Sequence, residues 1–201
     1  MADIALLERL CTAQGISGDE GAVRELILEE IRPYAEKITV TSMGNIIAEK
    51  KGRQPAKTRL LLNAHMDEVG LLVTSITEEG LLRFTTVGGI DRRILPGKAV
   101  LVAGKVPGVI GAKPIHMLDS SARAKAVPLD NLTIDIGASS KEEAETVVMP
   151  GDSVTFVSLF DTAHGMIRSR AIDDRAGCAI LIDLMKRELE YDCTFVFAVQ
   201  E

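Results

Sequence analysis

An imidazole and a carboxylate stand two residues apart where an apolar stretch of the sequence ends. The run TRLLLNAHMDEVG places His65 and Asp67 shortly after residues 60–62, a leucine triplet typical of a strand buried on both faces. Residues i and i+2 of a strand point to the same side, roughly 7 Å apart. One side chain could therefore bind a metal ion while the other orients it. Both could equally be solvated loop residues, which is the commoner case for so short a motif.

Two adjacent carboxylates mark a second candidate site, in RAIDDRAGCAI. Asp173 and Asp174 follow a predicted strand and open a predicted helix, so one of them could simply cap the helix. A cap needs only one acid, however, and neighbouring carboxylates repel each other unless a metal ion or Arg175 neutralises them. The sequence leaves the cap and the metal ligand equally open.

A third acid, Glu201, closes the apolar strand of FVFAVQE. In open α/β sheets the ligand binds beyond the carboxyl ends of the strands. His65, Asp173 and Glu201 all stand at such ends, and the coincidence of three is more informative than any one of them. His116 and His164 are isolated in the sequence, which favours structural or solvent-facing roles over metal binding.

The elements that must position these side chains alternate between helix and strand. Apolar residues at helical spacing predict a helix in GDEGAVRELILEEIRPYAE, with Ser17 or Asp19 as its N-cap. Residues 37–50 predict two strands around a turn at Gly44 and Asn45. Near the other end, GMIRSRAI predicts a strand, DDRAGCAILIDLMKRELE an amphipathic helix and CTFVFAVQ a buried strand. Such alternation favours an α/β layer structure.

Between these two α/β stretches the sequence changes character. Short apolar runs such as LLVTSI, LLRFTTV and AVLVAG are separated by Gly, Pro, Asp and Glu, a rhythm typical of a small β-barrel or sandwich. One short helix is predicted in SKEEAETVV, where Ser140 and Glu143 fit a capping box. We therefore predict an all-β domain at residues 69–162, inserted into an α/β domain formed by residues 1–68 and 163–201.

The composition excludes several classes of partner. The chain of 201 residues has a net charge of −6, an aromatic content of 3% and no Trp, which argues against nucleic acid. No apolar run reaches the roughly 18 residues that a membrane span needs. The N-terminal stretch does not resemble a secretory signal. Three widely spaced cysteines in apolar surroundings indicate reduced thiols, so we expect a cytoplasmic protein.

Several longer motifs together resemble a known family. NAHMDEVG, VGGIDRRILPGKAV, GVIGAKP, IDIGASSKEEA, PGD, AIDDRAG and FAVQE come in the order and spacing of the M42 metallo-aminopeptidases, and the similarity runs from GISGDE onward. The resemblance implies a split three-layer α/β/α catalytic domain, interrupted by a β-barrel dimerisation domain. It also implies two divalent metal ions (zinc or cobalt), peptide substrates, and self-association into a dimer or a dodecamer.

Carried over by position, the resemblance implies a role for each candidate residue. His65 is similar to the terminal ligand of one metal, and Asp67 to the acid that orients it. Asp173 is similar to the carboxylate that bridges both metals, often through a cis peptide to Asp174. Glu201 is similar to the general base, which takes a proton from water and delivers it to the leaving amine.

The sequence departs from the family pattern after Glu201. The pattern continues with a second glutamate, an aspartate and a histidine as ligands, so only His65 and Asp173 of five expected ligands are present. We therefore expect a truncated chain that lacks the C-terminal part of the catalytic domain, is inactive alone and exposes FVFAV as a sheet edge. Two other functions stay open: another two-metal amidohydrolase such as a deacetylase, or a non-catalytic module that self-associates through its β domain.

Overall fold

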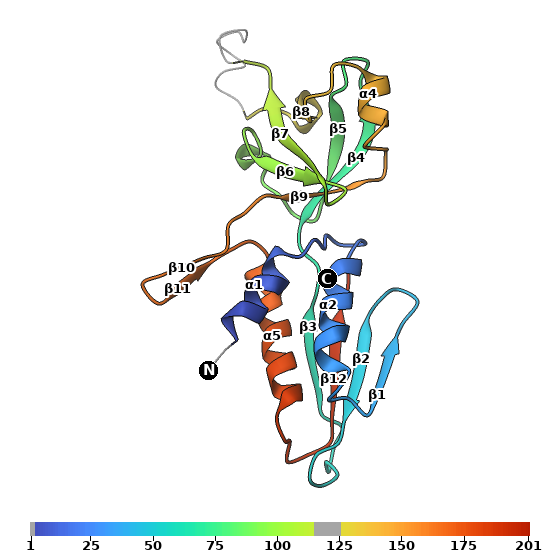
Figure 1. Cartoon of the computed structure of the whole chain (residues 1–201), viewed down its shortest axis with the longest axis vertical. Coiled ribbons are helices and arrows are strands. Elements are labelled where there is room, and N and C mark those ends of the chain that lie inside the picture. The colour runs from blue at the N-terminus through green and yellow to red at the C-terminus, as the bar shows by residue number, and fades with distance from the viewer. Residues whose placement is uncertain (1–2, 115–125) are drawn as a thin grey trace. The chain divides into compact units, whose positions relative to one another are not determined.

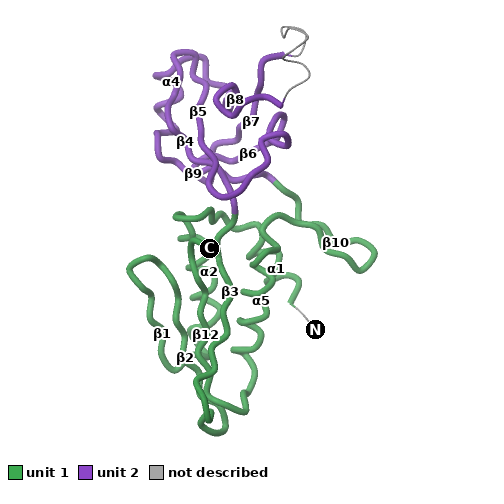
Figure 2. The backbone as a smooth tube through the Cα atoms, turned by 180° about the vertical axis from the view of Figure 1, so that it is seen from behind, with its two compact units in different colours: residues 1–68, 158–201 green, residues 69–157 purple. Residues whose placement is uncertain are grey.

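The computed structural model describes residues 3–114 and 126–201. The chain divides into two compact units, residues 1–68 with 158–201 and residues 69–157 (Figure 2). The second unit is thus inserted between two segments of the first. The sequence places the end of this insertion at residue 162, whereas the structure ends it at Val157. The difference arises because β10 (Asp161–Ala163) belongs to the first unit.

A short hairpin replaces one predicted strand of the α/β sheet. In GMIRSRAI only β11 (Met166–Arg168) is a strand, and it pairs with β10 in a separate two-stranded sheet. The predicted strand is therefore present but shorter, and it lies outside the four-stranded sheet.

The first unit is built on a four-stranded mixed sheet. Its strands are β1 (Lys37–Val40), β2 (Ile46–Lys50), β12 (Cys193–Ala198) and β3 (Leu61–His65), in that spatial order (Figure 1). β12 pairs antiparallel with β2 and parallel with β3. The parallel pairing matters for the position of the candidate site, because the carboxyl ends of β3 and β12 lie side by side at the same end of the strands.

The exposed edge of this sheet is not the predicted one. β12 lies between β2 and β3, and its Phe195 and Phe197 are fully buried, so the expectation that FVFAV forms an exposed edge is wrong. β3 is the edge strand instead. Leu60, Leu61 and Leu62 are 42%, 61% and 38% exposed, because no described strand pairs with the outer side of β3. The prediction that this triplet is buried on both faces is also wrong.

Three helices cover one face of the sheet: α1 (Ile4–Thr12), α2 (Gly21–Ile31) and α5 (Ile172–Lys186). α5 packs against α1, α2 and β3. Leu10, Ile27 and Ile182, one from each helix, are fully buried in a single cluster with Phe195 and Phe197. Burying each of these side chains stabilises the unit by roughly 1.5–3 kcal/mol. The described helices of the first unit all join this one cluster, so the three-layer arrangement stays a prediction.

The predicted N-cap of α2 is wrong. Glu20 occupies the cap position without a side-chain hydrogen bond to the helix, and Ser17 makes a different contact, described below. The turn at Gly44 and Asn45 is confirmed: it joins β1 to β2, and Gly44 has a φ of 107°.

The second unit is a closed six-stranded barrel, so the barrel is confirmed over the sandwich. Its strands follow the spatial order β4-β5-β8-β7-β6-β9 and enclose an apolar core that includes Leu71, Val100, Ile134 and Val154. The strands are β4 (Gly70–Ile76), β5 (Leu82–Val87), β6 (Ala99–Val102), β7 (Val106–Ala112), β8 (Leu132–Asp135) and β9 (Ser153–Phe156).

The predicted short helix in the barrel unit is also present, as α4 (Lys141–Glu145). The side chain of Ser140 accepts a hydrogen bond from the Glu143 N–H at 3.3 Å, as the capping box predicts. The described part of this unit also contains two 3₁₀ turns, η1 (Arg92–Ile94) and η3 (Leu129–Asn131). Among the described residues of the chain, no helix combines the length and the apolar character needed to cross a membrane.

Candidate active site

The imidazole and the two acids predicted at strand ends lie together, beside the carboxyl end of β3. His65 is the last residue of β3 and pairs with Ala198 of β12, which places it beside the segment that leads to Glu201. His65 Nε2 lies 3.2 Å from Asp173 Oδ1 and 3.4 Å from Glu201 Oε2. Residues more than 100 positions apart in the sequence therefore meet around one imidazole nitrogen.

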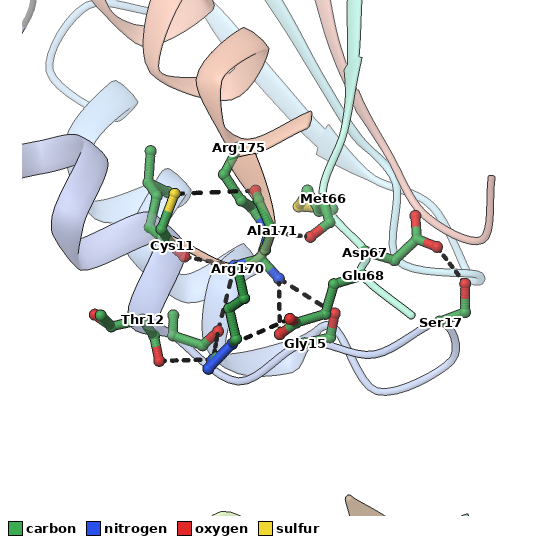
Figure 3. Close-up of polar contacts among 12 residues, drawn as sticks. Cys11, Thr12, Gly15, Ser17, Met66, Asp67, Glu68, Arg170, Ala171 and Arg175 are labelled. Carbon is green, nitrogen blue, oxygen red and sulfur yellow. Dashed lines mark hydrogen bonds and ion pairs between the residues drawn. The ribbon is translucent and has the colours of Figure 1, made fainter. Parts of the chain in front are cut away.

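The other nitrogen of the same ring faces Asp67. His65 Nδ1 lies 3.5 Å from Asp67 Oδ1, longer than an ordinary hydrogen bond, and has no hydrogen-bond partner among the described residues. Asp67 itself is 5% exposed. Its Oδ2 accepts a hydrogen bond from the Ser17 hydroxyl (Figure 3). Its Oδ1 accepts one from the Glu201 N–H at 3.2 Å. Through these two hydrogen bonds, Asp67, which follows β3, contacts both the segment that follows β12 and the loop between α1 and α2.

Negative charge surrounds His65. Burial by itself lowers the pKa of His65, but the hydrogen bond to Asp173 and the charges of Glu201, Asp67 and Asp174 together raise it above its ordinary value. A single imidazole among four carboxylates is a concentration of negative charge that a cation would neutralise.

The adjacent acids Asp173 and Asp174 divide the two roles that the sequence left open. Asp173 and Asp174 have non-helical backbone angles inside α5, and Asp174 caps the regular helix that follows: its Oδ1 accepts a hydrogen bond from the Gly177 N–H at 3.0 Å. The side chain of Asp173 is 95% exposed and faces His65. The peptide bond between them is cis, as the resemblance implies. A side chain at position 177 would meet the Asp174 carboxylate, since a Cβ there would lie 2.3 Å from Oδ1.

Arg175 does not neutralise this pair, so that alternative is wrong. Its side chain is fully buried and extends into the core, where Nε donates to the main-chain oxygen of Met66 at 2.5 Å. Its Nη1 donates to the Leu10 oxygen at 2.5 Å and its Nη2 to the Gly15 oxygen at 3.2 Å. Burial lowers the pKa of Arg175, and the charge of Glu68 opposes that effect.

Glu68 lies between Arg170 and Arg175 (Figure 3). Its Oε2 is 3.1 Å from Arg170 Nε, and its Oε1 is 3.7 Å from Arg175 Nη2. Burial raises the pKa of Glu68, while the two guanidinium groups lower it. Sequence reasoning missed Ser17, Glu68 and Arg170. The available signal was the presence of charged residues inside otherwise apolar motifs, but it does not say which partner each would find.

The donor chemistry at His65 suits a divalent metal, although the number of donors is too small. An imidazole nitrogen and a carboxylate are ordinary ligands of zinc, and His65 Nε2 and Asp173 present them side by side. Within residues 3–114 and 126–201, however, no group of three or more His, Cys, Asp or Glu side chains is arranged to hold a metal ion. The other two histidines do not contribute: His164 is exposed in the β10–β11 hairpin, and His116 lies outside the described residues.

A concavity of about 390 Å³ lies at the opposite end of the sheet from His65. It is lined by residues 55–60, which lead into β3, by the end of β2 and by the start of β12, and its charged side chains include Lys50, Lys57, Glu36 and Asp192. None of the predicted site residues lines it, so we assign the chemistry to the strand ends at His65.

Comparison with known proteins agrees with this arrangement. The family model for the M42 glutamyl aminopeptidases matches residues 44–201. A relative from Acetivibrio thermocellus is 37% identical over 198 residues, which make up 98% of this chain and 58% of the relative.

Two solved structures share the fold. The TET aminopeptidase of the marine sediment archaeon Thaumarchaeota archaeon SCGC AB-539-E09 has a TM-score of 0.91 at 35% identity, over 98% of this chain and 59% of that one. The TET1 peptidase of Pyrococcus horikoshii, which can assemble into a tetrahedron or a large octahedral shell, has a TM-score of 0.86 at 44% identity, over 98% and 61%. The chain spans about three fifths of the length of these relatives. It belongs to the M42 glutamyl aminopeptidase family.

Proposed function

We propose that this chain supplies part of the active site of a metal-dependent aminopeptidase that removes N-terminal residues from peptides. One observation carries the proposal: the two nitrogens of His65 face different carboxylates. Nδ1 faces the buried Asp67, and Nε2 faces the exposed Asp173 and Glu201. A carboxylate behind an imidazole and an open nitrogen in front is the usual arrangement for a metal-binding histidine.

Each of the four residues has a distinct proposed role. His65, through Nε2, and Asp173 would hold metal, and Asp67 would orient the imidazole from behind. Glu201 would act as the general base, taking a proton from the attacking water and passing it to the leaving amine. Two divalent ions, zinc or cobalt, would supply Lewis-acid polarisation of the scissile carbonyl. The side chain of Glu201 is 72% exposed, so it is accessible to water and substrate.

Metal binding by these 201 residues alone is proposed to be weak. A metal site in a protein ordinarily has three or four protein ligands, and this chain offers two of the five that the family pattern contains. Equilibrium dialysis against zinc or cobalt tests this point. Retention of two metal ions per chain would show that the ligand count is wrong.

Substitutions at the four residues test the proposed roles, on the protein as its gene encodes it, with any sequence that follows Glu201. Glu201→Gln keeps the size of the side chain but removes the base, so turnover of aminoacyl-anilide substrates should fall by about 10²–10⁴-fold at unchanged metal content. His65→Ala and Asp173→Asn should lose activity and metal together. Glu29→Gln is the matched control, because the Glu29 side chain is also 72% exposed. Near-normal turnover in Glu201→Gln would remove the base assignment.

Self-association through the barrel is a second part of the proposal. It is supported by the assembly of the TET1 relative and by apolar side chains on the barrel surface, where Ile94 is 57% and Val109 49% exposed. Ile94→Asp combined with Val109→Asp should reduce the molecular mass measured by sedimentation. Ile180→Asp, at a position 60% exposed on α5, is the control outside the barrel. An unchanged assembly in the double variant would exclude this surface.

A further inference from the structure

The carboxylate of Asp173 is placed by its main chain rather than by contacts of its own. Its side chain is 95% exposed, and its one hydrogen-bond or ion-pair partner among the described residues is His65. Asp173 has non-helical backbone angles, and within the same turn the Arg175 N–H donates to the Ala171 oxygen at 3.2 Å. The placement of Asp173 therefore depends on what holds the chain on either side of this turn, at Arg170 and Arg175.

Both arginines bind the C-terminal end of α1. A helix leaves its last carbonyl groups without main-chain donors, and a positive charge is favourable there. Arg170 Nη2 donates to the oxygen of Thr12, the last residue of α1, at 2.9 Å (Figure 3). It also donates to the oxygen of Ala13, the C-cap, at 2.9 Å. Arg175 Nη1 donates to the Leu10 oxygen at 2.5 Å. The turn between the two arginines is thus attached to α1 at both of its ends.

Glu68 joins the two arginines to the segment that carries His65. Its Oε2 is 3.1 Å from Arg170 Nε, and its Oε1 is 3.7 Å from Arg175 Nη2. The Glu68 N–H donates to the Gly15 oxygen at 2.9 Å, which fixes the backbone of Glu68 itself. Glu68 is 8% exposed and follows the end of β3 at His65 by three residues. Because breaking a buried pair leaves a charge without a partner, Arg170 is held firmly relative to β3.

We propose that Arg170 is a positioning residue that holds the Asp173 carboxylate beside His65. Its guanidinium binds the end of α1 and the carboxylate of Glu68 at the same time, so the chain that enters the turn has one place relative to β3. It acts through the main chain of residues 170–173. The inference rests on the proposed function only for what the Asp173 carboxylate binds, since the position of the turn is a property of the metal-free chain.

The first test measures amide hydrogen exchange in the metal-free 201-residue chain by NMR. The reporter is the Arg175 amide, whose hydrogen bond to the Ala171 oxygen closes the turn. Arg170→Gln removes the charge and the fork of donors, so this amide should exchange roughly tenfold faster or more. Amides in the middle of α5, around the fully buried Ile182, should change much less.

Two further variants make the comparison specific. Arg168→Gln is the matched control, because Arg168 also forms an ion pair at 3.1 Å, with Asp161, but its side chain is 77% exposed. It should leave the exchange of the turn unchanged. Arg170→Lys keeps a positive charge beside Glu68 but has no planar fork of donors that also reaches the end of α1. The Arg175 amide should therefore still exchange faster than in the wild type.

Two results would overturn the proposal. One is unchanged exchange of the Arg175 amide in the Arg170 variants. The other is an equal rise in exchange at Arg175 and at Ile182, which would mean that Arg170 stabilises the whole unit and does not hold the turn in particular. Because Arg170→Lys keeps the charge, it supplies the same comparison if Arg170→Gln does not fold.

A second measurement separates this inference from the proposed function. In the protein as its gene encodes it, Arg170→Lys should weaken zinc binding by roughly 10–100-fold, with Arg168→Gln close to the wild type. If the turn responds but the protein hydrolyses no peptide substrate, the proposed function fails and the role of Arg170 stands. If the protein is an active peptidase and Arg170→Lys changes neither the exchange of the turn nor the zinc affinity, the role of Arg170 fails alone.

Discussion

Arg175 donates a hydrogen bond from Nε to the main-chain oxygen of Met66, at 2.5 Å and across 109 positions of sequence. Arg175 follows the Asp173–Asp174 pair by one residue, and Met66 follows His65. The segments that carry the candidate imidazole and the candidate bridging carboxylate are therefore joined directly behind the site. Because Arg175 also binds the oxygens of Leu10 and Gly15, one buried guanidinium connects three parts of the fold.

The first prediction is that Arg175→Met strongly destabilises the first unit. The substitution removes buried hydrogen bonds to the main-chain oxygens of Met66, Leu10 and Gly15 and one partner of Glu68, which should cost about 3–5 kcal/mol of unfolding free energy. Urea unfolding, followed by tyrosine fluorescence, measures the unfolding free energy of the first unit. The chain has no Trp, and both of its tyrosines, Tyr34 and Tyr191, belong to the first unit.

Arg187→Met is the control for that experiment. Arg187 pairs with Asp183 one helical turn away at 2.5 Å, but its side chain is 58% exposed. Removing so exposed a pair should cost less than about 1 kcal/mol. Equal losses in the Arg175 and Arg187 variants would contradict the connecting role of Arg175.

The second prediction concerns Gly177 of α5, three residues after Asp174. Replacing a helical glycine by alanine ordinarily stabilises a helix by about 1 kcal/mol. Here the new Cβ would lie 2.3 Å from Asp174 Oδ1, so we expect Gly177→Ala to destabilise by about 1–3 kcal/mol. Gly21→Ala in α2 is the matched control, because its nearest neighbour is the Arg24 guanidinium at 3.7 Å. It should be neutral or stabilising.

A double-mutant cycle identifies the cause of that loss. If Gly177→Ala acts by displacing the carboxylate of Asp174, its effect should be much smaller in an Asp174→Ala background. Additive losses in the double variant would show that the contact with Asp174 is not responsible.

The third prediction is that the three thiols differ in reactivity. Burial raises the pKa of Cys178 to about 12, and its thiol donates to the main-chain oxygen of His65 at 3.2 Å. Burial also raises the pKa values of Cys11 and Cys193, but Cys193 is only partly buried. A raised pKa lowers the thiolate fraction at neutral pH and with it the rate of reaction. With a disulfide reagent, Cys193 should react first, and Cys11 and Cys178 only on unfolding. Mass-spectrometric mapping that finds Cys178 modified as fast as Cys193 would exclude this order.

Local sequence patterns predicted the helices and strands of this fold better than they predicted which strands pair with each other. The helix around Ile27, the capped helix at Ser140 and the barrel depend on spacing within a short stretch, and all are confirmed. The position of β12 in the centre of the sheet and of β3 at its edge depends on pairing between distant segments, which hydrophobicity does not reveal.

The candidate site shows the same limit. The sequence pattern predicted His65, Asp173 and Glu201 at strand ends. In the structure the carboxylates of Asp173 and Glu201 lie 3.2 and 3.4 Å from His65 Nε2. The contacts of Ser17 and Arg175 could not be predicted, because both partners are reached across loops. A serine near a helix start is more often a cap, and an arginine beside two aspartates is expected to pair with them.

The last prediction tests the order of the strands, where the sequence and the structure disagree most. Phe195 is fully buried in the central strand β12, so Phe195→Ala should cost about 3–5 kcal/mol of unfolding free energy through lost contacts and a cavity. Leu61 of β3 pairs with Thr194 of β12, next to Phe195, and is 61% exposed. Leu61→Ala in the 201-residue chain should therefore change stability by less than about 0.5 kcal/mol. The sequence pattern predicts the reverse, with the leucine triplet buried and FVFAV at the edge. Urea unfolding of both variants, followed by the fluorescence of Tyr34 and Tyr191, decides between the two orders. A larger loss for Leu61→Ala than for Phe195→Ala would mean that β3, and with it His65, lies inside the sheet.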